Sequence, residues 1–352
     1  MSHPLLIINP GSTSTKLALY DQTSLREVVS LSHAADELCR FCSIVDQYQF
    51  RLQAVEDFLL AQGNPKLTAV VGRGGLLKPL ASGCYLVNER MAADLRQGVQ
   101  GQHASNLGGL LAQGIAAPRG IPALIVDPVS VDEFSPLARL SGLPQISRRS
   151  LGHGLNIRAV ARRVAEDAGR SLLEMNFVVA HLGGGISVAP LSGGRILDYN
   201  NANEEGPFSP ERAGSLPARD VVSLAFSGQH SLQELIDLFN RRAGLVAYLG
   251  SNDARQAIAR AEAGDQYAQL VLAAMAYQIA KEISAMATVL CGRVDAIILT
   301  GGLAHARYIT DQISGYVQFI APVVLSPGED EMLALAEGAS SALSGQEPIY
   351  TY

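Results

Sequence analysis

The stretch Asn9-Pro-Gly-Ser-Thr-Ser-Thr-Lys16 lies between two short apolar runs, Leu5–Ile8 and Leu17–Tyr20. An apolar run, a polar turn and a second apolar run form the pattern of a β-hairpin. Gly11 lets the backbone approach an anion closely, and the serine and threonine hydroxyls that follow it can donate hydrogen bonds. Lys16 adds a positive charge suited to phosphate. We therefore predict a hairpin whose turn binds a phosphate group.

A second stretch repeats this pattern in the middle of the chain. The apolar run Phe177–Ala180 leads into His181-Leu-Gly-Gly-Gly-Ile-Ser187, and Val188–Leu191 returns. A further strand is predicted at Arg195–Asp198. Successive glycines expose backbone N–H groups that bind anions, and His181 can donate a hydrogen bond to a phosphoryl group, although a histidine beside glycines is more often structural. The two similar stretches suggest two related halves.

Helix and strand patterns alternate over the rest of the chain. Helices are predicted at Asp46–Gln62, Asn156–Ala168, Ser231–Arg242 and Gln266–Leu290. Strands are predicted at Ala69–Val71, Ala123–Val126 and Ala296–Leu299. The last strand precedes a third glycine turn, Thr300-Gly-Gly-Leu-Ala304, which is a weak signal by itself. Alternating strands and helices predict an α/β protein with its ligand chemistry at the strand ends.

Size and composition narrow the possible classes. A chain of 352 residues predicts two domains, and the proline- and glycine-rich break at residues 128–150 predicts a hinge crossing. The net charge of −6 gives no general reason to bind nucleic acid. The N-terminus lacks the basic region of a signal peptide, and Arg293 and Asp295 interrupt the apolar stretch Ala285–Ala304, which argues against a membrane span.

The absence of several signatures argues against other types of site. The sequence has no GxxxxGK[ST], no GxGxxG after a strand and no GxSxG, so a P-loop, a dinucleotide fold and an α/β-hydrolase are all disfavoured. Cys39 and Cys42 form a single CxxC without a second pair, which makes zinc improbable and predicts a reducing, cytoplasmic location.

Together, the three turns resemble a known family. NPGSTSTK, HLGGGIS and ILTGGLA match, in order, the two phosphate loops and the adenosine loop of the acetate kinase (acetokinase) family, in the acetate–sugar kinase/chaperone/actin superfamily. The resemblance extends over nearly the whole chain. Four segments resemble the butyrate kinase subfamily in particular: Val70–Leu80, Val126–Pro136, Glu204–Gly214 and Pro327–Met332.

The resemblance implies a fold. We expect an α/β protein with the two-domain actin-like ATPase (ribonuclease H-like) fold, a mixed five-stranded sheet flanked by helices in each domain, and an active site in the interdomain cleft. The N-terminal domain would span residues 1–130 and be completed by residues 331–352, and residues 131–330 would form the nucleotide-binding domain. The family also implies a homodimer or a larger homo-oligomer.

The resemblance also implies site residues. The residues implied to bind the nucleotide are Asn9, Ser12, Ser14, Lys16, Gly183, Gly184, Gly185, Gly301 and Gly302. Those implied to be catalytic are Arg212, His153, His181 and Asp127. Asp127 and Glu331 are implied to hold magnesium, and His103 to meet the substrate. Arg73 stands in Val-Val-Gly-Arg-Gly-Gly where the family has a histidine, and is a candidate for the substrate carboxylate.

The implied activity is transfer of the γ-phosphoryl group of ATP, with Mg²⁺, to a short-chain carboxylate, butyrate in the subfamily. One methylene changes binding by only about 1–3 kcal/mol, so acetate, propionate and isobutyrate remain alternatives. A non-catalytic actin-like nucleotide-binding protein is the alternative from a different class. The chain would act on small molecules, with neither nucleic acid nor membrane as a partner.

Overall fold

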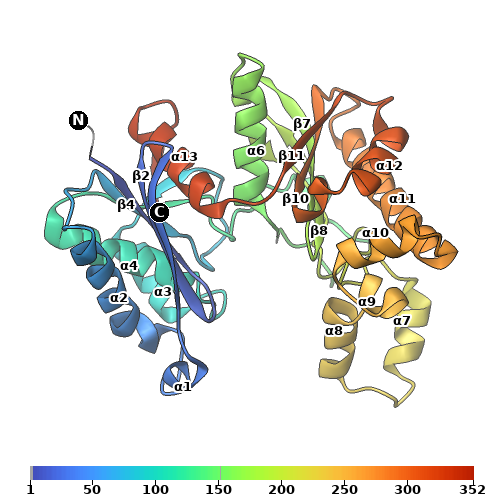
Figure 1. Cartoon of the computed structure of the whole chain (residues 1–352), viewed down its shortest axis with the longest axis horizontal. Helices are drawn as coiled ribbons and strands as arrows, with labels where there is room; N and C mark the ends of the chain where they lie inside the picture. The colour runs from blue at the N-terminus through green and yellow to red at the C-terminus, as the bar shows by residue number, and fades with distance from the viewer. Residues whose placement is uncertain (1–2, 151) are drawn as a thin grey trace. The chain divides into compact units, whose positions relative to one another are not determined.

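The computed structural model describes residues 3–150 and 152–352, and the chain forms two compact units. Unit 1 comprises Met1–Asp132, Gly154–Ala159 and Asp330–Tyr352, and unit 2 comprises Glu133–His153 and Val160–Glu329. Residues 1, 2 and 151 of the predicted domains lie outside the described residues. Each unit contains one mixed sheet with helices packed on it, which confirms the predicted α/β class (Figure 1).

The sheet of unit 1 has seven strands in the order β12-β5-β6-β4-β1-β2-β3. Their bounds are β1 Leu5–Pro10, β2 Ser14–Asp21, β3 Ser24–Ser32, β4 Ala69–Arg73, β5 Cys84–Leu86, β6 Ala123–Val126 and β12 Ile349–Thr351. β1, β4 and β6 are parallel, while β1–β2 and β2–β3 are antiparallel hairpin pairs. The implied five strands are wrong for this unit, because β5 pairs with β6 and β12 extends the sheet beyond β5.

Helices cover both faces of this sheet. The long helices are α2 Tyr48–Ala61, α3 Glu89–Gln97, α4 Asn106–Ala116 and α13 Glu331–Leu343, and the short ones are α1 Ala35–Leu38, η1 Val45–Gln47 and η2 Ala117–Arg119. α2, α3 and α4 share one apolar cluster with the sheet, and α13 packs in a separate cluster, on the other side of the strands (Figure 1). Glu331, the first residue of α13, contacts Asn9 of β1 and Arg73 of β4, so α13 begins near the carboxyl ends of the parallel strands.

The sheet of unit 2 has the predicted five strands, in the order β11-β10-β7-β8-β9. Their bounds are β7 Asn176–Leu182, β8 Ile186–Ser192, β9 Arg195–Ile196, β10 Ala296–Gly301 and β11 Val323–Pro327. In this sheet, β7 pairs antiparallel with β8 and parallel with β10, and β10 pairs parallel with β11. In unit 1, β1 pairs in the same way with β2 and β4, and β4 with β6. This shared topology supports the two related halves suggested by the sequence.

Most helices of unit 2 occur in two groups along the chain, one before β7 and one between β9 and β10. The helices of this unit are α5 Pro136–Arg139, α6 Gly154–Asp167, η3 Leu172–Glu174, α7 Ala218–Ala225, α8 Leu232–Arg241, α9 Gly244–Leu249, α10 Ala254–Glu262, α11 Gln266–Val289, η4 Gly302–His305 and α12 Arg307–Val317, with the first six residues of α6 belonging to unit 1. α11 is long and apolar enough to cross a membrane by length and composition, but half of its most apolar window is buried, and it shares an apolar cluster with residues of β7, β8, β10 and α12. It is therefore the core helix of this unit.

The predicted helices match α2, α6, α8 and α11 to within about two residues at each end. The strand predicted at Arg195–Asp198 is shorter, because the backbone after Ile196 turns to other partners: Leu197 donates to Pro190 and accepts from Ser135. The predictions omitted β3, β5, β11 and β12. These are edge or near-edge strands, and most of their residues are partly or fully exposed.

Candidate active site

The turn joining β1 and β2 consists of Gly11–Ser14, with Asn9 before it and Lys16 after it. Ser12, Thr13 and Lys16 are exposed. Within the described residues, nothing accepts a hydrogen bond from the N–H of Ser12 or Thr13. N–H groups without a protein acceptor, hydroxyls and a lysine are groups that can bind an anion, so the phosphate site at this turn stays a prediction. Asn9 connects the turn to another predicted site residue, Glu331.

Asn9 belongs to a cluster at the carboxyl ends of the parallel strands of unit 1. Its amide donates to Glu331 Oε2 at 2.7 Å, and Arg73 Nη2 lies 3.3 Å from Glu331 Oε1. Arg73 Nη1 also donates to the carbonyl oxygen of Asp127 at 3.3 Å. β1, β4 and β6 run in the same direction, so their last residues meet at one sheet edge, where α13 supplies Glu331. The structure thus unites four predicted residues from distant parts of the sequence.

Glycines explain how Arg73 is placed. A Cβ atom on Gly72 would lie 2.1 Å from the carbonyl oxygen of Gly108, and one on Gly108 would lie 2.1 Å from that of Arg73. The backbones of β4 and α4 therefore touch with no room for a methyl group. This close packing buries the Arg73 side chain to 9% exposure and holds its guanidinium at the sheet edge.

Asp127 directly follows β6 and is the most deeply buried of the predicted acidic residues, at 1% exposure. Its φ of 37° lies in the left-handed region, which is costly for a residue other than glycine. Oδ1 accepts from Arg158 Nη1 and from the N–H of Gly83, both at 2.7 Å. Oδ2 is buried and has no hydrogen-bond partner among the described residues. Such an oxygen, in a strained residue, is suited to a ligand.

His103 lies near this cluster but outside its hydrogen bonds. Its Nδ1 is 2.7 Å from the hydroxyl of Ser105. Partial burial lowers the pKa of His103 below its usual value, the positive charge of Arg73 lowers it further, and Glu331 acts in the opposite direction. His103 is thus neutral at neutral pH and can act as a hydrogen-bond partner for a substrate rather than as a second cation.

In unit 2, the β7–β8 turn contains Gly183, Gly184 and Gly185, and its last glycine lies against Arg212. A Cβ atom on Gly185 would lie 2.2 Å from Arg212 Nη1, so only glycine leaves room for the guanidinium. Ser209 joins the two segments, because its hydroxyl donates to Gly184 O at 2.5 Å and accepts from the N–H of Arg212 at 3.2 Å. Burial lowers the pKa of Arg212, partly offset by Glu211. Among the described residues, nothing accepts a hydrogen bond from the Arg212 guanidinium.

Two predicted histidines stack beside this turn. The rings of His153 and His181 lie 4.2 Å apart between centroids and 21° from parallel. His181 is the second-to-last residue of β7, at 1% exposure, and its Nε2 is 3.6 Å from Glu329 Oε2. His153 immediately precedes α6, and its Nδ1 is 3.5 Å from Ser187 Oγ. His181 Nε2 lies beside the turn, 3.2 Å from where a Cβ atom on Gly183 would stand.

The third glycine turn borders a cavity of about 810 Å³. Gly301 has a φ of 87° and its Cβ position is filled by Leu182 O, whereas Gly302 faces open space. Gly302 lines the cavity together with Asn252, Asp253, Ala254, Arg255, Ile258, Leu303, His305 and Ala306. A lining that combines apolar side chains with a few polar ones suits a nucleoside. The sequence analysis did not name Asp253 and Arg255, which line this cavity. The one local pattern that could have indicated them is Ser251-Asn-Asp253, a helix N-cap sequence before α10.

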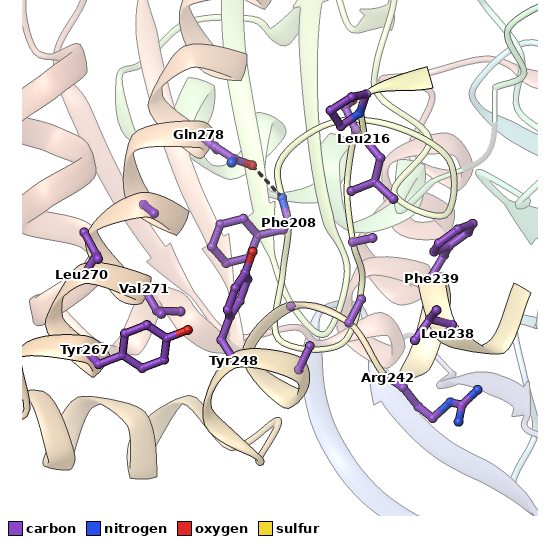
Figure 2. A pocket seen from close by; sticks show the side chains of 17 residues that line it. Phe208, Leu216, Leu238, Phe239, Arg242, Tyr248, Tyr267, Leu270, Val271 and Gln278 are labelled. Carbon is purple, nitrogen blue, oxygen red and sulfur yellow. Dashed lines mark hydrogen bonds between the residues drawn. The ribbon is translucent and has the colours of Figure 1, made fainter. Parts of the chain in front are cut away.

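A second cavity in unit 2, of about 690 Å³, contains none of the predicted site residues. It lies between α8, α9, α11 and the loop before α7, and Figure 2 shows the rings of Phe208, Phe239, Tyr248 and Tyr267 around it. Its apolar lining, with no cluster of charged groups, distinguishes it from the glycine turns.

Comparison with known proteins places these features in a family. The model of the acetokinase family matches residues 145–320. The chain is 51% identical over 352 residues to the probable butyrate kinase 2 of Caldanaerobacter subterraneus subsp. tengcongensis, covering 99% of both chains, and 48% identical over 357 residues to butyrate kinase 2 of Clostridium acetobutylicum, covering 100% of both.

Among solved structures, the acetate kinase of Porphyromonas gingivalis matches with a TM-score of 0.78 at 20% identity, over 98% of this chain and 100% of that one. This likeness confirms the implied actin-like ATPase fold. The matched family model covers half of the chain, and the full-length relatives share about half of its residues. The chain belongs to the acetokinase family.

Proposed function

We propose that this protein is a butyrate kinase, which transfers the γ-phosphoryl group of ATP to the carboxylate of butyrate to give ADP and butyryl phosphate. The observation that carries the proposal is the full-length identity of 51% and 48% to two proteins named as butyrate kinases. The predicted site residues support it, because they supply donors and cations where a nucleotide and a carboxylate have to be held.

Unit 2 is proposed to bind the nucleotide. The cavity beside Gly302 would take the nucleoside, and the Gly183–Gly185 turn its phosphates. Arg212 would then stabilise the transferred group, since its guanidinium is partly desolvated and has open donors. His153 and His181 would donate hydrogen bonds to the same group. Phosphoryl transfer depends mainly on such positioning and charge stabilisation.

Unit 1 is proposed to bind the acceptor acid, and its β1–β2 turn is proposed to bind a phosphate group of ATP. A short-chain carboxylate is already ionised at neutral pH, as are Asp and Glu, so the acceptor requires no general base. Cations are required instead, because two anions have to meet. Arg73, at low exposure, and Lys16 would supply them. His103 would contact the substrate as a neutral partner.

Magnesium is proposed as the cofactor, and Asp127 fits it best. The unpartnered Oδ2 of Asp127 is a hard oxygen ligand suited to Mg²⁺ or to a water bound to it. Both oxygens of Glu331 already contact Asn9 or Arg73, so Glu331 would act through water. When bound, Mg²⁺ neutralises phosphate charge. The residues of this chain hold and orient the reactants around it.

The assembly is proposed to be a cytoplasmic homodimer or larger homo-oligomer. The cavity of Figure 2 is bordered by exposed apolar side chains, including Tyr248 at 54%, Tyr267 at 52% and Leu270 at 64%. Apolar surface of this kind favours contact with another copy. Light scattering should give at least twice the mass of 37.2 kDa, and a monomer at micromolar concentration would refute this part of the proposal.

The acceptor is tested by hydroxylamine trapping. We expect acyl hydroxamate from Mg-ATP and butyrate at a higher kcat/KM than from acetate, propionate or isobutyrate. An optimum at one of those acids would correct only the chain length. No product with any acid from two to six carbons would refute the kinase and favour a non-catalytic nucleotide-binding protein.

The nucleoside cavity is tested by Gly302→Val. Gly302 has open space and no positive φ, so the valine should fold normally but occupy part of the cavity. We expect the KM for ATP to rise about tenfold, with the melting temperature unchanged. Gly142→Val, in a loop with equally open space, should leave both quantities unchanged. An unaltered KM in Gly302→Val would place the nucleoside elsewhere.

A further inference from the structure

Beneath the β1–β2 turn lies Arg51 of α2, a fully buried side chain at 0% exposure that the site described above does not use. Its Nη1 donates to the carbonyl oxygens of Gly11 at 2.9 Å and Ser14 at 2.8 Å, and its Nη2 to that of Ser12 at 3.2 Å. The remaining carbonyl of the turn, that of Thr13, accepts from the N–H of His33 at 2.8 Å. Every carbonyl oxygen from Gly11 to Ser14 therefore has a partner on the protein side.

This arrangement gives the turn a direction. Since its carbonyl oxygens are held inwards, the N–H groups of Ser12 and Thr13 are the backbone groups left exposed. A run of outward N–H groups is an anion-binding concavity. By binding the carbonyl oxygens, Arg51 leaves the positive N–H ends of the peptide dipoles to face a ligand.

The charge of Arg51 has no acidic partner among the described residues. Nε and Nη2 donate to Gln47 Oε1 at 3.0 and 2.8 Å, and Nη1 also donates to Thr15 Oγ1 at 3.0 Å. These partners are neutral. A guanidinium stays protonated even when buried, so a full positive charge sits under the turn without compensation, at a considerable desolvation cost.

The neighbouring histidine does not add a second charge. His33 Nε2 is 2.8 Å from Thr15 Oγ1, and the ring packs edge-on against Phe50. Burial lowers the pKa of His33, and Arg51 lowers it further, against the opposing effect of Glu37. His33 is therefore neutral at neutral pH, and Arg51 is the charged member of this buried network.

We propose that Arg51 is a positioning residue for phosphate binding: it orients the Gly11–Ser14 turn and leaves its own buried charge unneutralised, so that a bound phosphoryl group becomes its counterion. The inference rests on the proposed function, because it takes the turn to be a phosphate site. It explains why Gln47, rather than an acid, holds the guanidinium.

Gln47→Glu tests the charge without removing the arginine. Glutamate has the shape of glutamine and keeps an oxygen for Nε and Nη2, but it neutralises the guanidinium. We expect the Kd for ATP, measured by titration calorimetry, to rise on the order of tenfold. The Kd for adenosine, which lacks phosphate, should not change, and the melting temperature should be equal to or above that of the wild type. A purely structural Arg51 predicts no loss of ATP affinity in such a stable variant.

The control is Gln53→Glu, which adds the same charge on the exposed side of the same helix and should leave both affinities unchanged. Arg51→Lys should retain the preference for ATP over adenosine while losing turnover, because lysine keeps the charge but cannot hold three carbonyls. Arg119→Gln removes an arginine that donates to the carbonyl of Ile115 and should change neither affinity nor turnover.

An ATP Kd in Gln47→Glu equal to that of the wild type overturns the inference, while acid-dependent turnover in the same preparation would leave the proposed function intact. Conversely, ATP binding that weakens in Gln47→Glu, in a protein without acid-dependent turnover, would refute the kinase but keep the role of Arg51. A wild type that does not bind ATP overturns both.

Discussion

Replacement of Arg212 by alanine is expected to lower kcat about 10³-fold while the Kd for ATP changes less than threefold. The physical reason is the environment of the guanidinium. It lies against Gly185 in a partly buried position, and no described residue accepts a hydrogen bond from it. Its donors are therefore available to the charge that develops on the transferred phosphoryl group, where they contribute more than in the ground state. Single-turnover kinetics and calorimetry measure the two quantities.

Arg212→Lys should recover only part of the rate, because an ammonium keeps the charge but not the planar fork. Arg219→Ala, an exposed arginine of α7 in the same unit, serves as the control and should leave both quantities unchanged. Retention of kcat within tenfold in Arg212→Ala would contradict the catalytic role. Loss of ATP binding would instead mark Arg212 as a nucleotide-binding residue.

Gly108→Ala is expected to lower the free energy of unfolding by at least about 3 kcal/mol, although the same change stabilises most helices. A Cβ atom at this position in α4 would lie 2.1 Å from the carbonyl oxygen and 2.8 Å from the nitrogen of Arg73, so backbone would have to move. Urea denaturation measures the effect. Because the clash is with Arg73 itself, the residual folded protein should also have a higher KM for the acid.

The matched control is Gly315→Ala in α12, where nothing lies within 4 Å of the new methyl group. That variant should be more stable than the wild type by up to about 1 kcal/mol. If Gly108→Ala were as stable as Gly315→Ala, the close contact between β4 and α4 would not be the feature that positions Arg73.

Local patterns in the sequence predicted the strands and turns that carry most of the site. The β1–β2 and β7–β8 hairpins follow from apolar runs around glycine-rich turns, whereas Arg73 and Asp127 were implied only by the resemblance to the acetokinase family. The edge strand β12 and its neighbour β5 were not predictable in this way. They contain three residues each, and they pair with partners distant in the sequence.

The residues that sequence reading missed act through tertiary contacts. Arg51 appears in the sequence as one more polar residue of an amphipathic helix, yet it is fully buried and bonds a turn that precedes it by 37 to 40 residues. Arg158, likewise, pairs with Asp127 from α6. Neither partner is implied by spacing or periodicity, because both contacts arise only when the units fold.

In the proposed reaction, ATP phosphorylates a carboxylate. The most direct test is to count both products of one reaction: ADP and acyl hydroxamate formed from Mg-ATP, butyrate and hydroxylamine by the wild type. We expect equal amounts of ADP and acyl hydroxamate, both dependent on butyrate, and almost none of either with Arg212→Ala. ADP formed without hydroxamate, or at the same rate without butyrate, would contradict it, because the protein would then transfer the phosphoryl group to water.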